Sequence, residues 1–179
     1  MRNYGRVVYD GQVVSGQNTL TSSTAYFTKE DLGSLVSITD DNSYLYSFVG
    51  TIQQIVSSST VVLSSNVTLT SSVASVAVGK DNKNIINTLL NSVSGSGIYK
   101  NAYIPNGIFL TSNQIIIPNG VRLIGDGADY GYSTKHIGAG SGLVLAANLG
   151  YSNNFIVMGT DGAAFTSGKS RTSLVEVVS

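Results

Sequence analysis

The chain of 179 residues contains no cysteine, no tryptophan and a single histidine. The lack of cysteine excludes disulfides and metal sites built from thiolates. His136 has no second histidine with which to share an ion, so we interpret it as a surface or turn residue. We therefore expect neither a metal site nor a cofactor.

Charged residues are also few, at 11% of the chain, and the 10 Lys and Arg residues balance the 10 Asp and Glu residues. A neutral chain has no long-range field that favours nucleic acid or an anionic membrane. No apolar run approaches the roughly 20 residues that cross a bilayer, and residues 1–11 lack the apolar core of a secretory signal peptide. We expect no nucleic-acid partner, no membrane insertion and no export signal.

Serine, threonine, asparagine and glycine are abundant instead, which suits stacked β-coils and carbohydrate contact. Residues 1–79 contain alternating or β-branched runs separated by polar turns, and this pattern predicts an antiparallel β module. In one turn, Thr28 precedes the acidic Asp31 by three residues and Gly33 follows, which predicts one helical or 3₁₀ turn between strands. We interpret the Asp-Asp-Asn run at 40–42 as a hairpin turn, because it lacks the spaced acidic residues of a calcium loop.

A short helix is predicted over residues 81–93, where Asp81 can accept hydrogen bonds as the N-cap. The apolar positions expected on one face of this helix are Ile85, Ile86, Leu89, Leu90 and Val93. The helix runs out in the Ser-Gly-Ser-Gly sequence of residues 94–97.

The two prolines of the chain occur in two copies of the tetrapeptide Ile-Pro-Asn-Gly, at residues 104–107 and 117–120. Pro105 and Pro118 remove a donor from a strand ladder, and the following Asn-Gly pairs, which include Gly107 and Gly120, readily supply a positive φ. The repeated tetrapeptide therefore predicts two corners between short strands. A further apolar strand is expected over residues 121–127, where it ends in the turn glycines Gly125 and Gly127.

In these features the chain resembles the pectate-lyase-like parallel β-helix family, which builds many bacteriophage tailspikes and tail fibres as well as secreted polysaccharide-degrading enzymes. That family opens with an acidic helix cap, a Gly-rich break, an apolar-Pro-x-Gly-aromatic strand, an Ile-x-Pro strand and an apolar-x-Gly-x-Gly strand. The matching residues here are Asp81 with Ile85 and Leu89, Gly95 and Gly97, then 103–109, 115–118 and 121–127. The chain departs from the family at the helix, which lacks the usual Asp-Asp-Thr and alanines.

Residues 10–70 resemble a small β-domain that often precedes the helix cap in phage β-helix proteins. The specific part of this resemblance is Ala25, Phe27, Thr28, Asp31 and Gly33. Together the two resemblances imply an all-β chain. Residues 1–79 are expected to form a small sandwich or barrel-like module, which docks to the virion or caps the solenoid. Residues 80–179 are expected to form the helix cap and first coils of a right-handed parallel β-helix.

At roughly 20 to 25 residues per coil, about four coils fit between residues 80 and 179. The strand expected at 173–178 ends without the polar cap that a solenoid needs. We therefore expect the native protein to continue beyond Ser179.

The resemblance implies a component of a phage tail fibre or tailspike that attaches to the host and binds its receptor. It implies a homotrimer that contacts phage tail, baseplate or adaptor proteins and a host surface polysaccharide. Such a protein is made in the host cytoplasm and leaves by lysis as part of the virion tail. One alternative is a polysaccharide depolymerase, a lyase or glycoside hydrolase, with its active groove on later coils. A second is a bacterial surface adhesin.

The densest group of polar functional side chains contains Asp126, Asp129, Tyr130, Tyr132 and His136. Two carboxylates could share acid and base roles in glycoside hydrolysis, but Gly-Asp-Gly is ordinary turn chemistry. We favour the turn, and we assign no catalytic residue; Asp126 and Asp129 remain the weak candidates. The Gly-rich residues 138–142 precede an apolar β-like run rather than a helix, which excludes a dinucleotide loop. The 10 tyrosines are interpreted chiefly as packing residues rather than sugar-stacking platforms.

Overall fold

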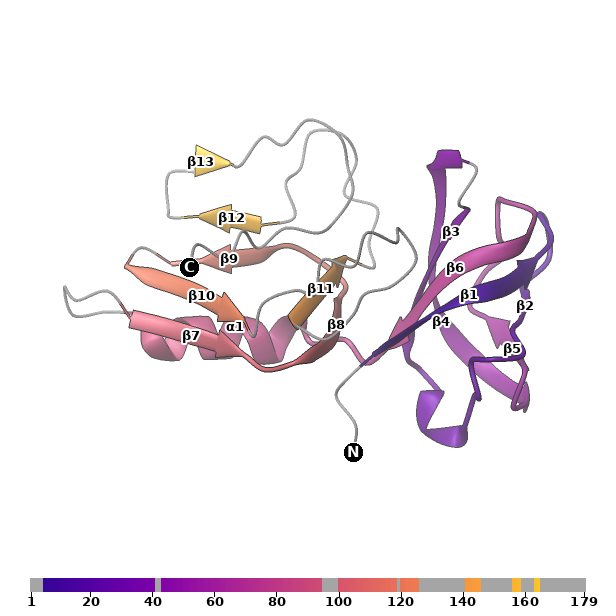
Figure 1. The fold of residues 1–179 in the computed structure, drawn as a ribbon, viewed down its shortest axis with the longest axis horizontal. Coiled ribbons are helices and arrows are strands. Elements are labelled where there is room, and N and C mark those ends of the chain that lie inside the picture. Colours follow the sequence, from indigo (N-terminus) through magenta and orange to yellow (C-terminus); the bar gives the residue numbers. More distant parts are fainter. Residues whose placement is uncertain are drawn as a thin grey trace. The chain divides into compact units, whose positions relative to one another are not determined.

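The computed structural model describes residues 5–40, 43–94, 100–118, 120–125, 141–145, 156–158 and 163–164 (Figure 1). The chain divides into two compact units, Met1–Asp81 and Asn82–Ser179. Strands dominate the described residues, and α1 is the one α-helix among them. The expected all-β class is therefore correct.

The first unit is a closed six-stranded barrel in which every pairing is antiparallel. Its strand order is β1-β2-β5-β4-β3-β6, with β6 returning to pair with β1. The N-terminal module was expected to be a sandwich or a barrel, and this closure shows that it is a barrel (Figure 1). The strands are β1 (Arg6–Val13), β2 (Thr19–Thr21), β3 (Leu35–Asp40), β4 (Ser43–Ser57), β5 (Thr60–Leu63) and β6 (Ser71–Gly79).

The barrel interior is filled by apolar side chains, because alternate residues of each strand point inward. Leu20 is fully buried between Thr19 and Thr21, which are half-buried. Two core residues, Ala25 and Phe27, come from the segment between β2 and β3 rather than from a strand. The core consists of Val8, Val13, Leu20, Ala25, Phe27, Val36, Ile38, Phe48, Ile52, Val61, Leu63, Val67, Leu69, Ala74, Val76 and Val78.

Strand β1 needs a glycine where it bends against β6. The register between the two strands shifts on both sides of Gly11. A Cβ at Gly11 would clash with Cγ2 of Val76 and lie 3.0 Å from the carbonyl oxygen of Ala74. The missing side chain therefore permits the close approach that accompanies this irregularity.

The segment between β2 and β3 contains the 3₁₀ turn that the Thr28 spacing predicts, as η1 (Lys29–Asp31). The Asp31 carboxylate accepts a hydrogen bond from the Thr28 backbone N–H at 2.9 Å. Gly33 follows with φ +73° and donates its N–H to the carbonyl of Ile52 at 2.8 Å. The local cap and the contact with β4 together fix the path of this segment.

In the second unit, α1 (Lys83–Val93) begins one residue later than expected, because Asn82 and not Asp81 is its N-cap. The carbonyl of Asn82 accepts the helical hydrogen bond of Ile86 N–H at 2.9 Å. Asn82 also donates its backbone N–H to the carbonyl of Leu110 at 2.8 Å and is only 2% exposed. This buried contact fixes Asn82 at the helix start and leaves Asp81 outside it.

The buried face of α1 is narrower than expected. Ile86 and Leu90 are buried, and Leu89 and Val93 pack against the same cluster. Ile85 was expected on this face but is 57% exposed. At about 100° per residue, Ile85 lies roughly a quarter-turn away from the centre of the buried stripe.

Three successive strands of the second unit pair in parallel with the next three, in the same order. The registers begin at Lys100 with Val121 for β7 and β10, at Gly107 with Ser141 for β8 and β11, and at Ile115 with Ile156 for β9 and β12. β13 adds to β12 in antiparallel fashion. The strands are β7 (Lys100–Ile104), β8 (Gly107–Thr111), β9 (Ile115–Ile117), β10 (Val121–Gly125), β11 (Ser141–Leu145), β12 (Ile156–Met158) and β13 (Ala163–Ala164).

Both Ile-Pro-Asn-Gly copies lie at strand junctions of this unit. Pro105 and Asn106 separate β7 from β8, and Pro118 begins the connection from β9 to β10. Gly107 and Gly120 have φ of +144° and +76°, which a residue with a Cβ rarely adopts. Inward side chains of the strands form one cluster with α1: Ile86, Leu90, Ala102, Ile104, Phe109, Ile115, Ile117, Val121 and Leu143.

Candidate functional site

The weak catalytic candidates predicted from the sequence lie outside the described residues. These are Asp126 and Asp129, in a group with Tyr130, Tyr132 and His136. The glycines Gly95, Gly97 and Gly127 and the strand expected at 173–178 also lie outside them. Among the described residues, Asp10 and Asp31 of the barrel are acidic side chains that each accept several hydrogen bonds.

Asp31 takes part in an ion pair that the sequence analysis missed. Arg6 Nη1 and Nη2 donate to the two oxygens of the Asp31 carboxylate at 2.8 and 2.9 Å, and Arg6 Nε donates to the Ala25 carbonyl at 2.7 Å. The guanidinium carbon of Arg6 lies 5.5 Å from the ring centroid of Phe27. This bidentate geometry joins β1 to the segment that carries η1.

The Asp31 carboxyl titrates below its ordinary range. Burial raises its pKa, but the hydrogen bond from Arg6, the Thr28 N–H and the positive charges of Arg6 and Lys80 lower the pKa by more. Asp31 is therefore a carboxylate at neutral pH, with both oxygens engaged. That arrangement suits a structural clamp better than a general acid.

Asp10 holds the same segment at a second point, just after β2. Its carboxylate accepts five hydrogen bonds, from the hydroxyls of Ser22, Ser23 and Thr24 and from the backbone N–H groups of Ser23 and Thr24. Burial raises the pKa of Asp10, and these hydrogen bonds outweigh burial and lower it far below its ordinary value. β1 and β2 share only two ladder positions, at Gln12 and Val13. Asp10 thus replaces backbone pairing beyond them.

The described part of the chain contains no group of three or more His, Asp or Glu side chains placed to hold a metal ion. Within the same residues, no helix is both long and apolar enough to cross a membrane. The carboxylates of Asp10 and Asp31 are both engaged in hydrogen bonds within the barrel, which is a structural role.

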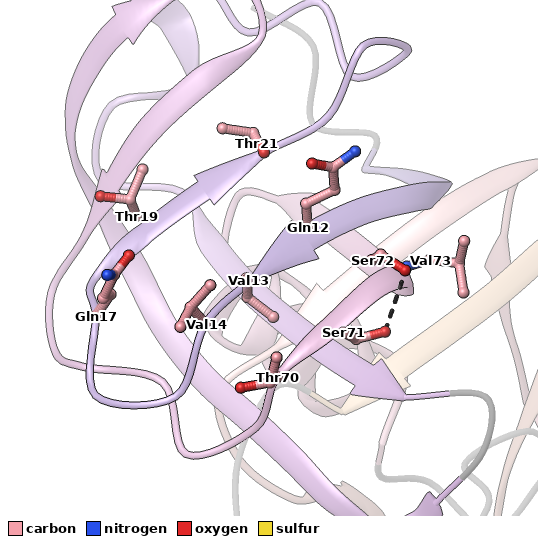
Figure 2. A pocket seen from close by; sticks show the side chains of 10 residues that line it. All are labelled: Gln12, Val13, Val14, Gln17, Thr19, Thr21, Thr70, Ser71, Ser72 and Val73. Carbon is pink, nitrogen blue, oxygen red and sulfur yellow. Dashed lines mark hydrogen bonds between the residues drawn. The ribbon is translucent and has the colours of Figure 1, made fainter.

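A pocket of about 540 Å³ opens on the barrel where the end of β1, the strand β2 and the start of β6 meet (Figure 2). Cross-strand register places Gln12 opposite Thr21 and Val13 opposite Ser71. Apart from three valines, the lining side chains are uncharged hydroxyls and amides. The lining residues are Gln12, Val13, Val14, Gln17, Thr19, Thr21, Thr70, Ser71, Ser72 and Val73.

This pocket was not predicted from the sequence. The alternation of Thr19, Leu20 and Thr21 predicts that the threonines share one face of a strand. This alternation does not predict which strands become neighbours. Residues 12–21 lie beside residues 70–73 only because the barrel closes. The polar, uncharged composition of residues 12–24 and 64–72 was the available signal.

Comparison of the chain with protein-family models, with curated proteins and with solved structures gave no match. The functional interpretation therefore depends on the residues and geometry of this chain.

Proposed function

We propose that this chain is the N-terminal portion of a bacteriophage tail fibre or tailspike, and that its second unit begins a right-handed parallel β-helix. The observation that carries the proposal is the repeated parallel pairing of β7, β8 and β9 with β10, β11 and β12. A parallel pair requires a crossover connection between its strands. Three such pairs in unchanged order support the proposal, because the same connectivity is expected where one coil stacks on the next.

The position of α1 also supports the proposal that the second unit begins a parallel β-helix. Ile86 and Leu90 belong to the apolar cluster formed by the inward residues of the strands, and α1 contacts β7, β9 and β10. A stack of coils exposes apolar side chains and open backbone groups at its ends unless another element covers them. α1 is suited to cover the first end of the stack.

The barrel supports an attachment role because it is a closed module with its own core. Each of the six strands pairs with a neighbour on both sides, so the barrel offers little open sheet edge for strand exchange when it docks to another protein. In the proposed protein the barrel binds tail, baseplate or adaptor proteins of the virion. Later coils of the β-helix meet the host surface polysaccharide, and three copies assemble into the fibre.

The test is immunogold electron microscopy of virus particles released from cultures that carry the gene, with antibody raised against the purified chain. Gold at the tail tip is the expected result. Particles without gold would contradict the proposal, and gold confined to the bacterial surface would favour the adhesin. Release of reducing ends from host surface polysaccharide by the intact protein would identify the depolymerase.

A further inference from the structure

The barrel pocket is lined mainly by uncharged polar side chains. Seven of its ten lining side chains are threonine, serine or glutamine, and none is charged. A ligand site for a typical apolar molecule is lined mainly by hydrophobic and aromatic groups. A site for phosphate or carboxylate uses cationic side chains or helix N-termini. The lining fits neither class.

Hydroxyl and amide side chains each offer both hydrogen-bond donors and acceptors. Vicinal hydroxyls of a sugar need the same mixture, because every sugar hydroxyl also donates and accepts. Val14 and Val73 are 48% and 52% exposed, so the pocket also presents apolar surface to the C–H groups of a sugar ring. The volume of about 540 Å³ lies within the range of small-molecule sites.

The rim of the pocket is held in place by backbone contacts. Gly16 takes φ +83° in the turn after β1 and donates its N–H to the carbonyl of Val67 at 2.8 Å. Val67 N–H returns a hydrogen bond to the carbonyl of Gln17, also at 2.8 Å. Ser15 N–H donates to the Thr70 hydroxyl at 2.9 Å. These contacts hold the backbone of the turn beside the pocket, so this part of the rim needs little ordering when a ligand binds.

We propose that this pocket is a binding site for a neutral saccharide. The outward-facing Thr19 and Thr21 on β2, with Gln12 opposite Thr21 on β1, form one side of the pocket and supply hydroxyl and amide groups to it (Figure 2). The inference does not rest on the phage assignment, which gives host contact to later coils and virion docking to the barrel. A saccharide site on the barrel could be present or absent with either outcome of the immunogold test.

The experiment is a titration of the full ¹⁵N-labelled chain, followed by amide chemical shifts, with maltose, lactose and chitobiose as neutral probes. Glucuronate and inorganic phosphate are the charged comparison probes. The expected result is saturable shifts of the amides of residues 12–21 and 70–73 with at least one neutral sugar. No shift with any neutral probe overturns the proposal, as does a response only to the charged probes.

The matched variant is Thr19→Val with Thr21→Val, which removes two hydroxyls while keeping β-branched side chains of similar shape. The expected loss of affinity is at least about fivefold, from two hydrogen bonds. Thr51→Val, on β4 and outside the pocket lining, is the control and keeps the affinity of the unaltered chain. Equal affinity of the double variant and the control overturns the proposal.

Discussion

At the scale of single residues, two aspartates hold the segment between β2 and β3 against the barrel. Asp10 accepts hydrogen bonds from Ser22, Ser23 and Thr24, and Asp31 pairs with Arg6. The two contacts lie on either side of Ala25 and Phe27, which enter the core. These side-chain contacts therefore add to the backbone hydrogen bonds that hold this segment, such as that from Phe27 N–H to the carbonyl of Ser58 at 2.7 Å.

Replacing Asp10 by asparagine is expected to destabilise the chain by about 1–3 kcal/mol. The amide N–H₂ of asparagine replaces one acceptor oxygen with a donor, which then faces the donors of residues 22–24. Urea denaturation at neutral pH measures the change. Glu30→Gln, at an exposed position of η1, is the control and is expected to leave the free energy of unfolding unchanged. Equal values for the two variants would contradict this role of Asp10.

The same contacts make stability depend on pH. Both Asp10 and Asp31 have folded-state pKa values below the ordinary 3.8, so the folded state binds fewer protons than the unfolded state in acid. Their contribution is therefore complete above about pH 5 and decreases as the pH falls below about 4. Denaturation curves from about pH 6 to about pH 2 should show this loss, with a shallower slope for Asp10→Asn. An identical slope for that variant would be the contrary result.

Gly11 is the residue for which space, rather than φ, matters. Gly11→Ala is expected to cost about 1–3 kcal/mol, because the new methyl group collides with Val76. Adding Val76→Ala removes the colliding methyl, so the double variant should lose less than the sum of the two single losses. A thermal denaturation cycle of the four proteins measures this coupling. Strict additivity would show that Gly11 is needed for another reason.

At the scale of elements, local signals in the sequence predict local structure. The spacing of Thr28, Asp31 and Gly33 predicts η1, and the apolar periodicity predicts a helix close to Lys83–Val93. The N-cap was misplaced because Asp81 and Asn82 are both good caps, and a tertiary hydrogen bond to Leu110 decides between them.

Long-range pairing is the part that the sequence does not predict. Arg6 lies 25 residues from Asp31, and no local pattern couples the two. Barrel closure and the pocket that it forms have the same origin, since the lining residues come from separate strands. Asp126 and Asp129 stand out in the sequence instead, because functional side chains are dense along the chain there.

The stacked pairing of the second unit makes a prediction about cross-linking. The chain lacks cysteine, so introduced pairs are unambiguous. Asn101→Cys with Arg122→Cys joins exposed register partners on β7 and β10, whose Cα atoms are expected about 5 Å apart. Mild oxidation should produce an intramolecular disulfide, measured by gel shift and mass spectrometry.

The control for this pair is Tyr103→Cys with Arg122→Cys. Tyr103 is exposed on the same strand as Asn101 but pairs with Ile124, which places its Cα about 8 Å from that of residue 122. This separation exceeds the disulfide limit of about 7 Å. Equal cross-linking of the two pairs would contradict the parallel register.

At the scale of the whole molecule, we propose that outward-facing apolar side chains of the second unit lie in contacts between copies. Tyr103 and Ile116 alternate with buried residues on β7 and β9, yet they are 51% and 52% exposed. The chain carries no net charge that would keep copies apart. In the proposed fibre, contacts among three copies cover these side chains and stabilise the assembly.

The central claim about assembly, that the chain forms the trimer expected of the proposed phage tail fibre, is tested most directly by multi-angle light scattering of the purified protein. We predict a mass three times that of the 18.7 kDa protomer, retained on dilution. A monomer across the whole concentration range would contradict the claim.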